Sequence, residues 1–123
     1  MGLFNAMLGN ASDVDPKEVE EEYRPILAEG ETIEAAFKMV RDLYIFTSKR
    51  LILVDKQGMT GRKVEYRSIP YRAVTQFTVE NAGTFDADSE MKIWISGQAE
   101  PLTRELKRGA NVEAIQKALA SIL

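Results

Sequence analysis

The chain lacks two residue types on which much enzyme chemistry depends, since it contains neither cysteine nor histidine. Without cysteine there is no disulfide and no thiolate metal site, and without histidine the Ser-His-Asp and Cys-His systems and ordinary zinc sites are excluded. Catalysis would have to use carboxylate pairs, Lys, Tyr or a hard cation bound by carboxylates. We therefore expect a protein that is not an enzyme and that needs no cofactor or metal.

Long apolar runs are also missing. No segment approaches the ~20 apolar residues that cross a bilayer, and residues 1–8 lack the basic flank of a secretory signal. With 123 residues and 45% hydrophobic content, the chain is long enough to hide roughly two thirds of its unfolded surface in one core. We expect a cytoplasmic protein with one structural unit, in which a helical segment, 1–30, packs on a domain formed by 31–123.

Basic residues are scarce in one part of the chain and acidic residues are scarce in another. Asp13–Glu34 holds nine acids and two bases, a net charge of −7, whereas Arg41–Arg72 holds eight bases and three acids, a net charge of +5. These segments can be ordinary solvated faces. They can also be opposite patches that meet head to tail between copies of the chain.

What the chain does have is a strong hairpin pattern at Leu43–Asp55. Two apolar, β-branched or aromatic runs flank the polar turn Thr47-Ser48-Lys49-Arg50, which is typical of a β-hairpin. The second run is apolar on both faces, so its strand must be covered on both sides. We expect a central strand in a well-covered sheet, with a helix or another subunit over the second face.

The remaining pattern predicts helices at both ends and strands between them. Residues 1–8 and a segment beginning at Asp15-Pro16 favour short helices, the second shortened by Pro25. Asn111 is a suitable N-cap for a C-terminal helix with an apolar stripe. The expected strands are Ile33–Val40, Asp42–Thr47, Arg50–Asp55, Arg62–Ile69, Val74–Glu80, Glu90–Ser96 and Pro101–Lys107. This order predicts an α+β, mainly β fold: a small bent antiparallel barrel with the last helix at an open end.

Several motifs resemble those of the bacterial pleckstrin-homology-like domain family. They are the segments 42–53 (DLYIFTSKRLIL), 58–66 (GMTGRKVEY), 68–71 (SIPY), 80–86 (ENAGTFD) and 92–97 (KIWISG). The resemblance implies a bent seven-stranded sheet closed by a C-terminal helix, with no enzymatic activity. It also implies a cyclic homo-oligomer, for which we expect five subunits, and a polar surface between adjacent subunits that binds another protein.

Some apolar side chains have no obvious cover within a small barrel. Met91, Ile93 and Ile95 take the core side of their strand, so Trp94 points to the other face, and tryptophan is a favoured interface anchor. We expect an oligomer interface that includes Leu3, Phe4, Met7, Leu8, Leu51, Leu53 and Trp94. Cover from the same chain is the alternative.

The acidic loop after Gly83 is a candidate surface for a partner protein. Asp86, Asp88 and Glu90 alternate, and such carboxylates can bind calcium or do acid–base work. The glycine, the spacing and the terminal bidentate Glu of a calcium loop are absent. We therefore assign Thr84, Asp86, Asp88 and Glu90 to protein contacts, with an unidentified protein as partner.

An alternative function is the binding of anionic lipid headgroups at a membrane surface through Lys49, Arg50, Arg62 and Lys63. A cation near an anionic membrane contributes about 1 kcal/mol, but the net charge of −3 opposes such binding. The remaining bases are scattered and no aromatic residues alternate with them, so we expect no nucleic-acid binding. Membrane association is the less favoured expectation.

Overall fold

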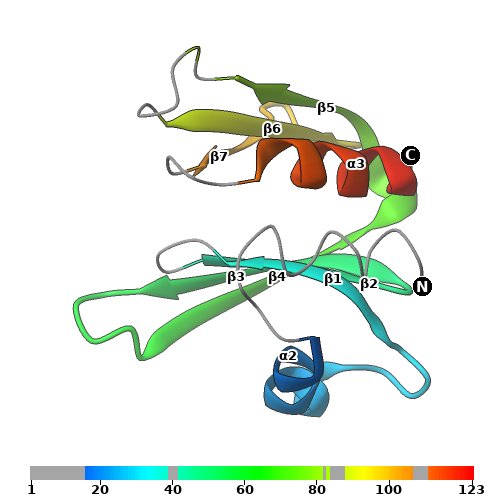
Figure 1. Ribbon diagram of the computed structural model, residues 1–123, viewed down its shortest axis with the longest axis vertical. Helices are drawn as coiled ribbons and strands as arrows, with labels where there is room; N and C mark the ends of the chain where they lie inside the picture. The colour runs from blue at the N-terminus through cyan, green and yellow to red at the C-terminus, as the bar shows by residue number, and fades with distance from the viewer. Residues whose placement is uncertain (1–15, 39–41, 82, 84–87, 107–110) are drawn as a thin grey trace.

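The computed structural model describes residues 16–38, 42–81, 83, 88–106 and 111–123. In these residues the strands form two antiparallel sheets of four and three strands (Figure 1). The first sheet contains β1 (Ile33–Lys38), β2 (Asp42–Thr47), β3 (Arg50–Gln57) and β4 (Lys63–Pro70), and the second contains β5 (Val74–Glu80), β6 (Ser89–Ile95) and β7 (Leu102–Leu106). The helix α2 (Pro16–Tyr23) precedes the strands and α3 (Val112–Ile122) follows them. The mainly β fold expected from the sequence is confirmed.

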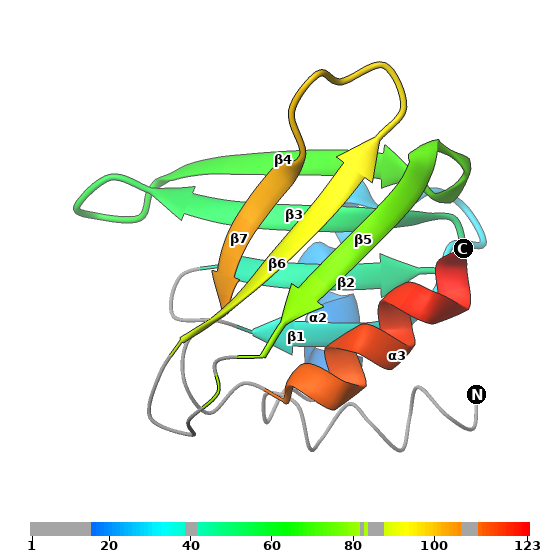
Figure 2. The same cartoon turned by 90° about the horizontal axis from the view of Figure 1, so that it is seen from above.

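The chain passes from one sheet to the other at Pro70. This residue has no main-chain N–H, so it cannot donate to a further ladder bond, and it ends β4. The short 3-10 helix η2 (Tyr71–Ala73) then turns the chain into β5. Seen from above, the strands of the two sheets cross at a large angle, which gives the molecule its bent, barrel-like form (Figure 2).

The core lies between the two sheets and follows the period-two alternation of strands. Phe37 on β1 and Phe46 on β2 meet edge to face, with ring centroids 5.8 Å apart. Met91 and Ile93 face them from β6 and are 2% and 0% exposed. The alternation predicted for this strand is therefore confirmed at both positions.

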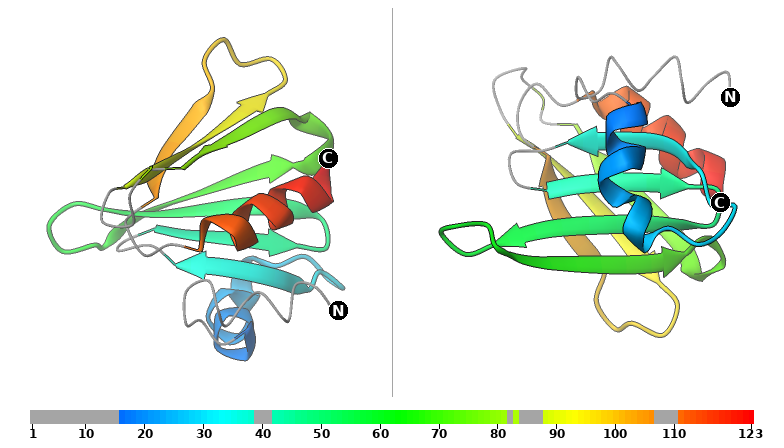
Figure 3. Two further views of the ribbon diagram at one scale, coloured as in Figure 1. Left: turned by 45° about the horizontal axis from the view of Figure 1, so that its top comes forward. Right: turned by 90° about the horizontal axis from the view of Figure 1, so that it is seen from below.

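The helix α2 covers the other face of the four-stranded sheet (Figures 1 and 3). Val19 and Tyr23 are buried and belong to the same core cluster as the strands, and the Tyr23 ring meets that of Tyr66 on β4 at 6.4 Å. The α-helix gives way at Tyr23 to the 3-10 helix η1 (Arg24–Ile26), which contains Pro25. This confirms the predicted shortening, because proline cannot continue the α-helical bond pattern.

The helix α3 lies along an open side of the two sheets, beside β5 (Figure 2). Asn111 caps it as predicted, since its side-chain oxygen accepts the N–H of Ala114 at 3.1 Å. Ile115 and Leu119 are 1% and 0% exposed. Within the described ranges, neither α2 nor α3 has the length and apolar content needed to cross a membrane.

The position of two leucines corrects the expected oligomer interface. Leu51 and Leu53 are 1% and 2% exposed. Both faces of β3 are covered within one chain, by the second sheet on one side and by α2 on the other (Figure 1). Leu51 and Leu53 therefore belong to the core and offer no surface to a second copy.

Candidate functional site

The turn between β2 and β3 is held by the side chain of Thr47. Its hydroxyl oxygen accepts the main-chain N–H groups of Lys49 and Arg50 at 3.0 and 2.9 Å. The same hydroxyl donates to Oε2 of Glu31 at 2.5 Å. Because Thr47 is 2% exposed, these bonds satisfy a polar group whose burial would otherwise destabilise the hairpin.

The guanidinium group of Arg50 is engaged at each of its nitrogens. Nε and Nη2 donate to the two carboxylate oxygens of Glu31 at 2.9 and 3.1 Å. Nη1 donates to the Ser68 hydroxyl at 2.8 Å, and Nη2 also donates to the carbonyl oxygen of Ile26 at 2.6 Å. These bonds leave Arg50 little capacity for an external phosphate, although its side chain is 26% exposed.

Glu31 is a carboxylate whose side chain is fully buried, with 0% exposure. The N–H of Ala28 donates to its Oε1 at 2.8 Å. Burial raises the pKa of Glu31, but the hydrogen bonds from Arg50, Thr47 and Ala28 outweigh burial and lower the pKa from 4.5 to about 2. The network fastens the segment after η1 to the β2–β3 turn, so we assign it a structural role.

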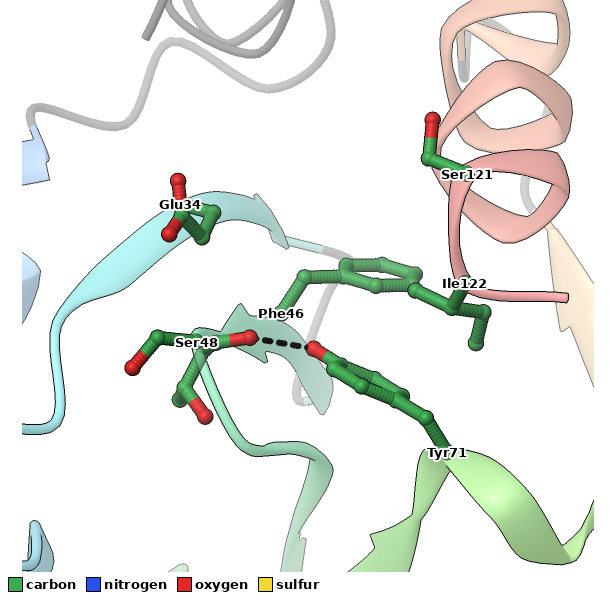
Figure 4. A pocket seen from close by; sticks show the side chains of 7 residues that line it. Glu34, Phe46, Ser48, Tyr71, Ser121 and Ile122 are labelled. Carbon is green, nitrogen blue, oxygen red and sulfur yellow. Dashed lines mark hydrogen bonds between the residues drawn. The ribbon is translucent and has the colours of Figure 1, made fainter.

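A cavity of about 360 Å³ lies beside this turn, between β1, η2 and the last turn of α3 (Figure 4). Apart from Thr47, it is lined by Glu34, Phe46, Ser48, Tyr71, Ser121 and Ile122. The Tyr71 hydroxyl donates to the carbonyl oxygen of Thr47 at 2.5 Å, which fixes the ring against the cavity. Burial and, second, the charge of Glu34 raise the pKa of Tyr71, so this residue is neutral at physiological pH.

The cavity is chemically simple. It combines the carboxylate of Glu34 with hydroxyl groups and two aromatic rings, and none of the described residues that line it is lysine or arginine. Elsewhere in the described residues, no group of three His, Cys, Asp or Glu side chains is placed to hold a metal ion. This chemistry suits binding better than acid–base catalysis, which needs a positioned proton donor and acceptor.

Trp94 lies on the outer face of the three-stranded sheet. Trp94 follows the buried residue Ile93 on β6 and lies opposite Gln76 of β5 in the antiparallel pair. Because neighbouring residues of a strand point to opposite faces, Trp94 points away from the core as predicted. It is half-buried, and its neighbours on this face include Lys92 and Glu90, whose charged groups are 3.7 Å apart. No labelled helix or strand covers this face (Figure 1).

Other residues of the two expected protein surfaces are only partly described. Asp88 is exposed and Glu90 is half-buried at the start of β6. Leu3, Phe4, Met7, Leu8, Thr84 and Asp86 lie outside the described residues. Of the predicted interface and partner residues, the structure therefore places Trp94 and Glu90 on one outer face.

The four cations of the alternative lipid site do not gather in one place. Lys49 and Arg50 lie where β3 begins, whereas Arg62 and Lys63 lie beyond its other end, in and after the β3–β4 turn. That separation is about 25 Å for eight extended residues. The β3–β4 turn also extends away from the body of the molecule (Figure 3), so the two pairs cannot hold one headgroup.

Reasoning from the sequence missed Glu31, Glu34, Tyr71 and Ser121. Glu31 and Glu34 belong to an acidic segment that can equally be a solvated face. Tyr71 follows a proline in a connection, and Ser121 is a polar position of an amphipathic helix. The Thr47-x-x-Arg50 spacing was the signal for the network, since both side chains bind Glu31.

Comparison with known proteins supports the fold described above. A family model described as bacterial PH domain matches residues 2–123. The uncharacterized protein YjqA of Bacillus subtilis (strain 168) is 54% identical over 123 residues, covering 99% of this chain and 98% of its own.

Two solved structures agree with this match. The chain is similar to a pleckstrin homology domain from Shewanella amazonensis SB2B, with 59% identity, 98% coverage of both chains and a TM-score of 0.85. It is also similar to a DUF1696 family protein with a pleckstrin-homology domain from Shewanella loihica PV-4. That match has 53% identity, 93% and 97% coverage and a TM-score of 0.79.

Proposed function

We propose that this chain, which belongs to the bacterial PH domain family, is a non-enzymatic interaction module. Copies of the chain assemble into a closed ring, and the ring presents a polar surface to another protein. The observation that carries this proposal is the outer face of the three-stranded sheet, which no labelled helix or strand covers (Figure 1). This face holds Trp94, the single tryptophan of the chain, among polar neighbours, and tryptophan anchors many protein interfaces.

A ring needs a second, different patch on each copy, because a heterologous contact joins unlike surfaces. The acidic side chains of α2 supply one, since Glu18 and Glu22 are exposed. The basic β3–β4 turn supplies its complement, since Arg62 and Lys63 are exposed at the far end of the hairpin. Part of the charge asymmetry is used inside one chain, where Glu31 pairs with Arg50 and Glu21 with Arg24, so the other exposed charges are the ones left for contacts between copies.

The test compares two single substitutions by size-exclusion chromatography with light scattering. Trp94→Ser should lower the mass of the assembly, because it removes the anchor from the outer face. Leu123→Ser is the matched control: Leu123 is a 67% exposed apolar residue at the end of α3, outside the outer sheet face and both charged patches, and its loss should leave the mass unchanged. Equal masses for the wild type and both variants would reject the role given to this face.

The proposal places the protein in the cytoplasm and gives it a protein as its physiological partner. A pull-down should use the intact assembly as bait, since a surface shared by neighbouring subunits is lost in isolated protomers. Retention of the same partner by an assembled chain and by a monomeric variant would show that the shared surface is unnecessary. Lipid binding stays an alternative outcome, and vesicles can separate it from assembly.

A further inference from the structure

Among the described residues, the cavity beside the β2–β3 turn has one carboxylate and no basic side chain in its lining. Glu34 lines it, and within the described part of the chain its carboxylate forms neither an ion pair nor a hydrogen bond. This differs from Glu31, three residues earlier, which is fully engaged by Arg50 and Thr47. Figure 4 shows Glu34 on β1, across the pocket from Ser121 and Ile122 of α3.

Two of the hydroxyl groups around the cavity donate their hydrogens to main-chain carbonyl oxygens. The Tyr71 hydroxyl donates its hydrogen to the carbonyl oxygen of Thr47, and the Ser121 hydroxyl donates to the carbonyl oxygen of Lys117 at 2.8 Å. Each oxygen keeps lone pairs with which it can accept a hydrogen bond. These two oxygens can therefore accept hydrogen bonds from a ligand, whereas the Ser48 hydroxyl accepts the N–H of Thr32 at 3.1 Å and can donate its own hydrogen.

The last turn of α3 favours a cationic ligand. Ser121 and Ile122 belong to this turn and line the cavity. The C-terminal end of a helix carries a partial negative charge that cations stabilise, yet this turn contains no basic residue. The two aromatic rings, Phe46 and Tyr71, provide faces that attract a cation in the same way.

We infer that this cavity binds a cationic nitrogen group, an alkylammonium such as the end of a lysine side chain. Glu34 supplies the countercharge, and the side chains of Phe46, Tyr71 and Ile122, which line the same cavity, supply contacts for the alkyl chain. The volume of about 360 Å³ is at the small end of ligand sites, so it suits a single short chain. The ammonium comes either from a lysine of a partner protein or from a free small amine. The inference does not depend on ring assembly.

The test is a titration of the full-length chain followed by amide NMR shifts, with n-butylammonium chloride as the probe. Shifts should appear around residues 34, 48, 71 and 121, and n-butanol, which has no charge, should not reproduce them. Glu34→Gln should weaken binding about tenfold, the effect of losing a charge-assisted hydrogen bond. Glu65→Gln is the matched control, because Glu65 is an exposed carboxylate on β4 that does not line the cavity.

A second variant keeps the inference testable if Glu34→Gln does not fold. Ser121→Lys places a tethered ammonium in the last turn of α3, where a cation favours the helix, and it should abolish binding by occupying the cavity. A glycine-flanked lysine peptide distinguishes the sources: tighter binding than butylammonium indicates a protein ligand, and equal or weaker binding indicates a free amine. Equal shifts with butanol and butylammonium, or unchanged affinity in both variants, would overturn the inference.

Discussion

Glu31 and Arg50 form a two-point ion pair across 19 residues of sequence, with Arg50 Nε and Nη2 at 2.9 and 3.1 Å from the two carboxylate oxygens. The pair joins the segment between α2 and β1 to the turn between β2 and β3. Such parallel bonds are the strong form of an arginine–carboxylate contact. This ion pair stabilises the packing of the segment before β1 against the β2–β3 turn. It also limits the capacity of Arg50 to bind an external ligand.

Removing the arginine should be costly. Arg50→Ala leaves the buried carboxylate of Glu31 without its countercharge, so we expect the free energy of unfolding to fall by about 3–5 kcal/mol. Chemical denaturation measures this change. Lys49→Ala is the control, because Lys49 is exposed in the same turn and its loss should change stability by less than about 0.5 kcal/mol. Equal effects of the two substitutions would show that the ion pair does not fasten the turn.

Acid should weaken the same contact. The pKa of Glu31 is lowered from 4.5 to about 2 in the folded chain, so the folded state binds the proton less readily than the unfolded state. The stability that this residue contributes is fully present above its unfolded pKa and is lost as the pH falls from about 5 towards 2. Denaturation curves across this range should show a smaller acid-induced loss for Glu31→Gln than for the wild type. Parallel losses in both proteins would contradict the proposed linkage.

Anionic vesicles should not retain the protein through its hairpin turns. Arg50 is engaged by Glu31, Ser68 and Ile26, and Lys49 lies at the opposite end of β3 from Arg62 and Lys63. Each end then offers only about 1–2 kcal/mol of attraction to an anionic surface. Co-sedimentation with phosphatidylcholine vesicles, with and without phosphatidylserine, measures this. Binding that follows phosphatidylserine content and is lost in a combined Lys49→Ala, Arg62→Ala and Lys63→Ala variant would instead support the lipid alternative.

The fold was largely predictable because most of its helices and strands begin or end at residues that mark the boundary in the local sequence. The bounds of β2 and β5 agree with the prediction to the residue, since polar turn residues or a proline stand close to them. The helix α3 has a capping asparagine and a regular apolar stripe. Pro70 marks the point at which the chain leaves one sheet for the other. Each of these signals acts within a few residues, so sequence reasoning could use it.

The candidate site was not predictable, because folding brings its parts together from distant segments. Glu34, Tyr71 and Ser121 lie on β1, η2 and α3, and none of them is unusual in its local sequence. Arg50 was assigned to lipid contact because a charged turn residue suggests exposure, and nothing nearby shows that Glu31 will bind it. Leu51 and Leu53 were assigned to an interface because the cover provided by the second sheet is a tertiary feature.

The most direct test of the proposed assembly is sedimentation velocity of the unaltered chain over a range of concentrations, at low and at high salt. We expect a closed species whose mass is a fixed multiple of the 13.8 kDa protomer, with less of it at high salt because screening weakens contacts between charged surfaces. A single species of 13.8 kDa at every concentration and in both salts would contradict the account.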